Sequence, residues 1–353
     1  MLPRLLCLSL LAPVALVAPQ DAVAEIATRL RNPKLTLDER IALEEKLLAF
    51  GENGARTLQK IVEERIQRTD EHVKKTEKAY LADFEKAARK LVEGRLDKDS
   101  LAEIDVARKV VLDLSKDAAL SKERIHNEGD PAREKLSKLL FVQLDSVLEA
   151  KPELAATRDT LSNELFDIEQ DHALWQRCNW GIPEKKRGKP LADPVNRWPE
   201  LEQAEAWACL MATPMSDADR DVFTKNRALA PELAEPEEAA GILDLNRLRV
   251  LLGLNALLCD VKLCAAARDH SNDMRTLGFF AHESPVPGKK TPWDRAARFG
   301  TSAGAENIAA GQQTGADANL AWWYSPGHHK NMLGSHSRMA LGRSEHMWTQ
   351  MFG

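Results

Sequence analysis

Aromatic residues are scarce in this sequence: they make up 5% of its 353 residues, and the first half is poorer still. Between positions 25 and 174 there is no Trp and no Cys, with one Tyr, four Gly and three Pro. All eight Trp and most of the Gly and Pro follow this stretch. Because the two parts differ so strongly in composition, we expect them to have different folds.

The chain also lacks a long hydrophobic run. The longest, LLCLSLLAPVALVA, follows Arg4 and is shorter than the ~18 to 20 residues that cross a bilayer. It contains Pro13, and the small residues Ala22-Val23-Ala24 have the spacing that signal peptidase prefers. We therefore predict a signal peptide over residues 1–24, with Ala18 as an alternative cleavage position, and no membrane span. The mature protein is expected to be secreted, periplasmic or held at the cell envelope.

Cysteine is rare, and no CxxC pair occurs, which argues against a cysteine zinc site. Removal of the signal peptide leaves Cys178, Cys209, Cys259 and Cys264. An even number in an oxidising compartment favours disulfides, but four cysteines allow three connectivities and the sequence does not choose among them. Pairing of Cys259 with Cys264, and of Cys178 with Cys209, is the arrangement we favour.

Neither sign of charge dominates. The net charge is -5, and acidic and basic residues alternate along the chain, so the sequence does not indicate nucleic-acid binding. It also lacks the His-Glu-x-x-His helix of zinc peptidases.

Residues 25–175 are predicted to be helical. Thr36 and Glu39 have the spacing of a capping box, and apolar residues from Leu58 to Leu91 recur every three or four positions. Asp130-Pro131 is predicted to be an N-cap followed by a proline at the first helical position. We expect an all-α hairpin or bundle with coiled-coil character, which could mediate self-association. A connector that carries Pro and Trp should follow at residues 176–236.

Residues 237–353 contain six of the nine histidines. Amphipathic helices are predicted at 237–252 and 260–277 because apolar residues line one face of each. His270 falls on the apolar face of the second helix, so we expect a core histidine that is hydrogen-bonded to a backbone carbonyl. His328 and His329 are adjacent, so they cannot both face the same site.

Seven motifs follow one another from about Leu245 to Gly353: LNRLRVLLGL, AARDHSNDM, GFFAHESP, TPWDRA, AENIAAG, WWYSPGHHKNML and WTQMFG. Together they resemble the CAP superfamily of cysteine-rich secretory, antigen 5 and pathogenesis-related proteins, in its bacterial SCP-like extracellular form. The resemblance implies an α-β-α sandwich, and thus an α+β chain in which this domain follows the helical region. It further implies that His282, Glu306 and His328 face a common cavity, while His329 points outward.

The sequence departs from the family pattern at several positions. Ser325 and Met347 stand where other members complete a tetrad with a glutamate and a histidine, and Ala305 replaces the glycine before Glu306. A three-residue site is therefore expected. Two imidazoles and a carboxylate are suitable ligands for a divalent metal such as zinc.

Two functions remain open. The first is a non-enzymatic extracellular module that binds a lipid, peptide, glycan or protein, or an envelope component. The second is a metal-dependent, peptidase-like hydrolase, in which His282 and His328 hold the metal and Glu306 is the catalytic base that activates water. The resemblance favours the binding module, and hence a protein that is not an enzyme.

Overall fold

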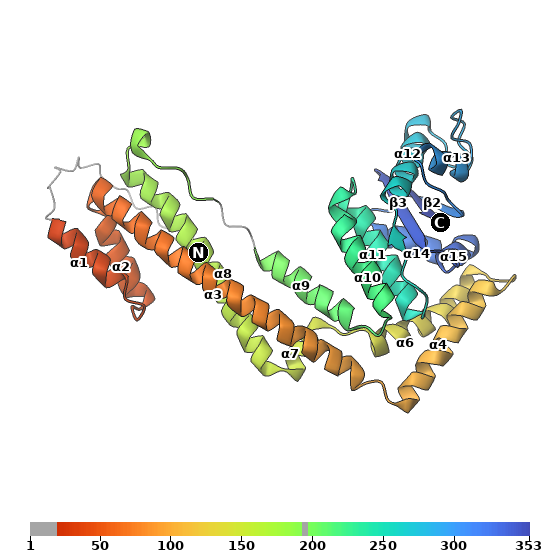
Figure 1. Ribbon diagram of the computed structural model, residues 1–353, viewed down its shortest axis with the longest axis horizontal. Coiled ribbons are helices and arrows are strands. Elements are labelled where there is room, and N and C mark those ends of the chain that lie inside the picture. The colour runs from red at the N-terminus through yellow and green to blue at the C-terminus, as the bar shows by residue number, and fades with distance from the viewer. Residues whose placement is uncertain (1–19, 193–196) are drawn as a thin grey trace, which may run out of the picture. The chain divides into compact units, whose positions relative to one another are not determined.

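The computed structural model describes residues 20–192 and 197–353. These residues form two compact units: residues up to 82 together with 153–203, and residues 83–152 together with 204–353 (Figure 1). Most of the predicted signal peptide, residues 1–19, lies outside the described part of the chain. Its last five residues begin the first described helix.

The first unit is all helical, as the composition predicts. Its elements are α1 (Gln20–Leu30), α2 (Leu37–Leu48), α3 (Gly51–Glu93) up to residue 82, α8 (Pro152–Cys178), and short 3-10 turns at Asn179–Gly181 and Glu184–Lys186; it also contains the start of α9 (Arg197–Ala212). The predicted capping box opens α2, where the Thr36 hydroxyl accepts a hydrogen bond from the Glu39 amide and the Glu39 carboxylate accepts one from the Thr36 amide.

Helices α3 and α8 run antiparallel to each other. Arg65 binds Asp171, and seven residues further along α3, His72 binds Glu164, which lies seven residues earlier in α8. Leu58, Val62, Val73 and Tyr80 of the predicted stripe are buried. Beyond Tyr80 the buried positions are Phe84, Ala88 and Val92, whereas Leu91 at the end of the predicted stripe is only partly buried, because the 3.6-residue period drifts around a long helix.

The second unit contains a mixed sheet and most of the helices. Its helices are the end of α3, α4 (Lys98–Lys116), α5 (Lys122–Arg124), a π-helical turn (Ile125–Gly129), α6 (Asp130–Leu140), α7 (Leu144–Ala150), the rest of α9, α10 (Asp217–Leu229), a 3-10 turn (Ala230–Glu232), α11 (Pro236–Leu251), α12 (Val261–Leu277), α13 (Pro292–Arg298), α14 (Gly315–Trp323) and α15 (Pro326–Met332). Its strands are β1 (Leu258–Cys259), β2 (Ala305–Ala310), β3 (Arg338–Ser344) and β4 (Met347–Phe352).

The strands are arranged in the order β1-β3-β4-β2, so β2 is an edge strand. It pairs antiparallel with β4, with Glu306 opposite Met351 and Asn307 opposite Gln350. Strand β1 pairs in parallel with β3, and β3 pairs antiparallel with β4. The short hairpin between β3 and β4 turns at Glu345, which has a positive φ of 53°.

Helices cover both faces of the sheet (Figure 1). On β3, the side chain of Leu341 reaches Gly241 of α11, whereas the next residue, Gly342, meets α12: a Cβ atom there would lie 2.1 Å from the Arg268 nitrogen. Because successive residues of a strand point to opposite faces, α11 and α12 lie on opposite sides. This arrangement confirms the predicted α-β-α sandwich and the α+β class.

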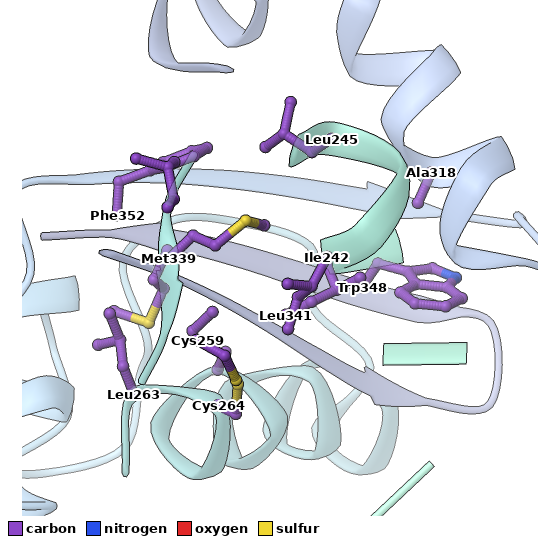
Figure 2. Packing of buried hydrophobic residues seen from close by; sticks show 14 of the residues in the cluster. Ile242, Leu245, Cys259, Leu263, Cys264, Ala318, Met339, Leu341, Trp348 and Phe352 are labelled. Carbon is purple, nitrogen blue, oxygen red and sulfur yellow. The ribbon is translucent and has the colours of Figure 1, made fainter. Parts of the chain in front are cut away.

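The core of the sandwich fills the space between these layers (Figure 2). Its larger buried side chains are Ile242, Leu245, Leu263, Trp322, Met339, Leu341, Trp348, Met351 and Phe352. Both predicted helices form here. Asp260 caps α12 by accepting from the Leu263 amide, and Gly278 ends it in a left-handed conformation with φ 69°.

Residues of α4 and α6 pack on the sandwich. Ile104, Val111 and Leu136 share one buried cluster with Leu251 and Trp323. Arg108 of α4 donates a hydrogen bond to the Leu251 carbonyl at the end of α11. These contacts assign residues 83–152 to the same unit as the sandwich, although the sequence divided the chain at residues 175 and 236.

Asp130 does not cap a helix, contrary to the expectation from Asp130-Pro131. The backbone is already helical at Gly129, and no side-chain hydrogen bond caps α6. The Asp130 carboxylate instead accepts hydrogen bonds from the Trp323 indole (2.9 Å) and the Tyr324 hydroxyl (2.6 Å). These two hydrogen bonds hold α6 against the end of α14.

Candidate functional site

Glu306 lies on the edge strand β2, with its side chain on the α12 and α13 face of the sheet and only 2% exposed. The free edge of β2 is covered by α15. There the Asn331 side-chain amide donates to the Glu306 carbonyl at 3.2 Å and to Asn307 Oδ1 at 2.8 Å. These bonds satisfy backbone and side-chain groups that the end of the sheet leaves unpaired. Residues from both helical layers therefore meet around Glu306.

The Glu306 carboxylate is bound on both oxygens. Arg295 of α13, whose side chain is fully buried, donates to Oε2 at 2.5 Å, and the His282 Nδ1–H donates to Oε1 at 3.0 Å. Arg295 also donates to the carbonyls of His282, Lys289 and Lys290. One guanidinium thus neutralises the buried carboxylate and fixes the loop that carries His282.

Local sequence explains the position of Arg295. Thr291 and Asp294 form a reciprocal capping box at the start of α13, and Pro292 occupies its first turn. This rigid start orients Arg295 one residue after Asp294. The TPWDRA motif is evident in the sequence, but the role of its arginine is not.

His282 and His328 are neighbours. Their ring centroids are 6.3 Å apart in an edge-on arrangement, and the His282 side chain is 51% exposed. His328 lies on α15 and is half-buried. Burial lowers the pKa of His328, and the electrostatic interaction with His282 lowers it further. His328 is therefore neutral near pH 7. The structure thus brings His282 into contact with both Glu306 and His328.

His329 points away from this group, but it does not point to solvent. Its side chain is fully buried, with its ring centroid 4.2 Å from that of Trp323, and its Nδ1–H donates to the Trp323 carbonyl at 2.8 Å. Its Nε2 has no hydrogen-bond partner among the described residues. The expectation that His329 points outward is wrong in this respect, because α4 and α6 bury the side of α15 that the isolated domain would expose.

His270 occupies the core, as its place on the apolar face of α12 predicts. Its Nε2–H donates to the Ala281 carbonyl at 3.0 Å, and its ring contacts Phe279. Burial lowers the pKa of His270. This histidine therefore helps to hold the loop that leads to His282.

A chain of buried amides crosses the other side of the sheet. The Asn307 amide donates to Gln350 Oε1, and the Gln350 amide donates to Asn319 Oδ1. Asn319 in turn donates to the Gly241 carbonyl and to Asp244 Oδ2. No sequence pattern indicates this network, because its members become neighbours only when β2, β4 and α14 come together.

The amide chain ends at a cavity of about 670 Å³, formed by α6, α11 and α14. Its walls are apolar at Leu248, Leu251 and Trp323, and charged at Arg133 and Asp244. Burial raises the pKa of Asp244. The cavity has the size of a small-molecule site, but its aspartates and arginines do not define one ligand class.

The predicted metal ligands are not arranged as the coordination shell of a metal ion. Among residues 20–192 and 197–353, no three His, Cys, Asp or Glu side chains are grouped as a metal would require. Glu306 accepts one hydrogen bond on each of its oxygens, from Arg295 and from His282.

Comparison with known sequences agrees with this fold. The profile of the CAP family, described as the Cysteine-rich secretory protein family, matches residues 244–351. The C-terminal part of the chain is therefore a CAP domain, which confirms the resemblance seen in its motifs.

A curated relative, the Uncharacterized protein YkwD of Bacillus subtilis (strain 168), is 35% identical over 134 residues. These residues are 36% of this chain and 51% of the relative, so the chain spans about half of the relative's length.

Two solved structures are also similar. An extracellular protein containing a SCP domain from Bacillus anthracis str. Ames is 24% identical, with a TM-score of 0.31 over 42% of this chain and 49% of that one. An outer surface protein from Borrelia burgdorferi is 21% identical, with a TM-score of 0.29 over 32% of this chain and 87% of that one.

Proposed function

We propose that this protein is an extracellular binding module, in which the CAP domain recognises a ligand at His282 and His328 without catalysing a reaction. Export is part of the proposal and follows from the predicted signal peptide. In the described part of the chain, no helix is both long enough and apolar enough to cross a bilayer.

The observation that supports binding over catalysis is the state of Glu306. A general base must be free to accept a proton from a water molecule. Here both carboxylate oxygens already accept hydrogen bonds, one from the buried Arg295 guanidinium and one from His282. The carboxylate is therefore engaged by two protein donors, which supports a role in positioning His282.

The two imidazoles are suited to a polar, uncharged ligand group. His282 is exposed, and because its Nδ1–H is bound to Glu306, its Nε2 is free to accept a hydrogen bond. His328 is half-buried and neutral, so it offers one donor and one acceptor nitrogen. Hydroxyl and amide groups, which glycans and peptides present, match this pair.

Elemental analysis of the purified protein, followed by a peptidase screen with and without a chelator, tests the proposal. We expect no stoichiometric metal and no chelator-sensitive cleavage. Cleavage that a chelator abolishes, and that is lost in both Glu306→Gln and His328→Ala, would establish the metal-dependent hydrolase instead.

Ligand binding itself is tested by nuclear magnetic resonance. Soluble glycan fragments and short peptides of the envelope are added to protein with labelled histidine side chains. We expect shifts of His282 and His328 and none of His270, which is the matched buried control. Shifts that are absent for every probe would contradict binding at this pair.

A further inference from the structure

Cys259 and Cys264 lie beside each other in the core of the CAP domain (Figure 2). Cys259 is the last residue of β1, and Cys264 lies in the first turns of α12. Their sulfur atoms are 3.8 Å apart, and their exposed fractions are 4% and 0%. Cys178 belongs to the other unit, and Cys209 is not part of this core cluster.

The backbone on both sides of this pair is held firmly. The Cys259 amide donates to Asn226 Oδ1 at 2.8 Å, and the next amide, that of Asp260, donates to Met339 on β3. The Cys264 amide donates to the Asp260 carbonyl at 2.8 Å in the first turn of α12. The two sulfurs are thus held face to face by the surrounding fold.

We infer that Cys259 and Cys264 form a disulfide in the exported protein, while Cys178 and Cys209 remain thiols. The inference rests on the proposed export, which supplies an oxidising compartment. A disulfide has an S–S length of about 2.05 Å, so the sulfurs must approach by roughly 1.8 Å, which small side-chain rotations can provide.

The reaction is a thiol–disulfide exchange with an extracellular disulfide of the form R–S–S–R. The first cysteine sulfur attacks one sulfur of the oxidant and releases one RSH. The second cysteine sulfur then attacks the mixed disulfide and releases the other RSH. Two S–H bonds are lost and one S–S bond forms, while the oxidant gains two protons and two electrons. Because both sulfurs are buried in the folded domain, exchange is expected during folding.

The other two cysteines are protected within their own units. Cys178 is fully buried among α1, α2 and α3, and Cys209 is 7% exposed. Burial raises the pKa of Cys178 to about 12 and that of Cys209 to about 11. We expect these two to remain thiols because each is buried within a different unit.

Peptide mapping tests the inference, since Lys262 lies between the two cysteines and trypsin cleaves after it. Exported protein is alkylated under denaturing conditions without reductant, digested, and analysed by mass spectrometry. We expect peptides 250–262 and 263–268 to be joined, with Cys178 and Cys209 alkylated. Reduction should then lower the melting temperature by roughly 4–9 °C. No such shift is expected in the Cys259→Ala, Cys264→Ala double variant, whereas Cys178→Ala should keep it.

A second sample tests whether Cys259 and Cys264 can pair in protein that has not been exported. Protein purified from a reducing cytosol is unfolded, refolded with oxidised glutathione and mapped in the same way. Absence of the 259–264 link in both samples overturns the inference. A link that forms only with glutathione supports the geometry but overturns the disulfide in the exported protein.

Discussion

Arg295 and Glu306 form an ion pair that is almost entirely excluded from solvent, with exposed fractions of 0% and 2%. A carboxylate in this position would be costly without a cation, a set of donors or a metal. In this chain the cation comes from α13, eleven residues before Glu306. The ion pair therefore supplies a positive charge next to the buried carboxylate.

Arg295→Met should destabilise the CAP domain by roughly 3–5 kcal/mol, because it leaves the Glu306 charge buried without its partner. The double variant Arg295→Met, Glu306→Leu should recover much of this loss, since it removes both charges. Urea denaturation of the two variants and the parent protein measures the difference. Equal stability of Arg295→Met and the parent would show that the ion pair does not form.

The contacts of Arg295 and Glu306 show which residues of the site could be predicted from the sequence and which could not. His282 and Glu306 could be named from GFFAHESP and AENIA, and the structure places them in contact. Arg295 could not be named, because it meets Glu306 only after the loop of residues 278–291 folds over β2. Asn331 and Gln350 were missed for the same reason, since partners across a sheet edge have no fixed spacing in sequence.

The fold was predictable where periodicity and capping are local. The capping box at Thr36, the helix that begins after Asp260 and the left-handed Gly278 all follow from neighbouring residues. The role of Asp130 did not, because Trp323 and Tyr324 compete for its carboxylate from nearly 200 residues away. Tertiary contacts of this kind override a local capping signal.

Acid should destabilise the protein through its buried histidines. Burial lowers the pKa of His270, His328, His329 and His336, so between the folded values and the ordinary value of about 6.5 the unfolded chain binds more protons. The free energy of unfolding is therefore expected to be constant above about pH 7 and to fall as the pH decreases below about 6.5. Urea denaturation between pH 5 and 8 measures this.

The His329→Asn variant measures how much His329 alone contributes to the pH dependence of stability. The Asn amide can replace the donor to the Trp323 carbonyl but does not titrate. We expect the slope of stability against pH below 6.5 to decrease by up to about 1.4 kcal/mol per pH unit. An unchanged slope would mean that His329 does not contribute.

Asp130→Asn should change the ionisation of Tyr324. The hydrogen bond from the Tyr324 hydroxyl to the Asp130 carboxylate raises the pKa of this tyrosine, and nearby burial adds to the effect. Loss of the negative charge should bring the pKa down toward 10 and destabilise the domain by roughly 1–3 kcal/mol. Tyr80 is the other tyrosine of the chain, so absorbance titration in a Tyr80→Phe background reports Tyr324 alone. A pKa that does not move would contradict the contact.

The mature N-terminus is expected at residue 19 rather than at residue 25. Cleavage after Ala24 would remove the first five residues of α1, including Val23, which packs with Ala27 and Leu30 in the first unit. Cleavage after Ala18 leaves this helix complete. N-terminal sequencing of exported protein distinguishes the two, and a chain that starts at Glu25 would show that α1 forms without its first turn.

A fragment of residues 204–353 should be more stable than one of residues 237–353. Two side chains of α10 hold the start of the sheet: Asp219 accepts from the Ala256 amide, and Asn226 binds both the Leu257 carbonyl and the Cys259 amide. The shorter fragment leaves the Ala256 and Cys259 amides without these partners, which costs roughly 1–3 kcal/mol for each that stays buried, whereas the Leu257 carbonyl keeps its hydrogen bond from Asn246. Circular dichroism during heating measures both fragments. In the longer one, Asn226→Ala is the matched variant and should lower the melting temperature toward that of the shorter fragment. Equal melting temperatures for the two fragments would instead restore the boundary at residue 237 and make α10 an accessory helix.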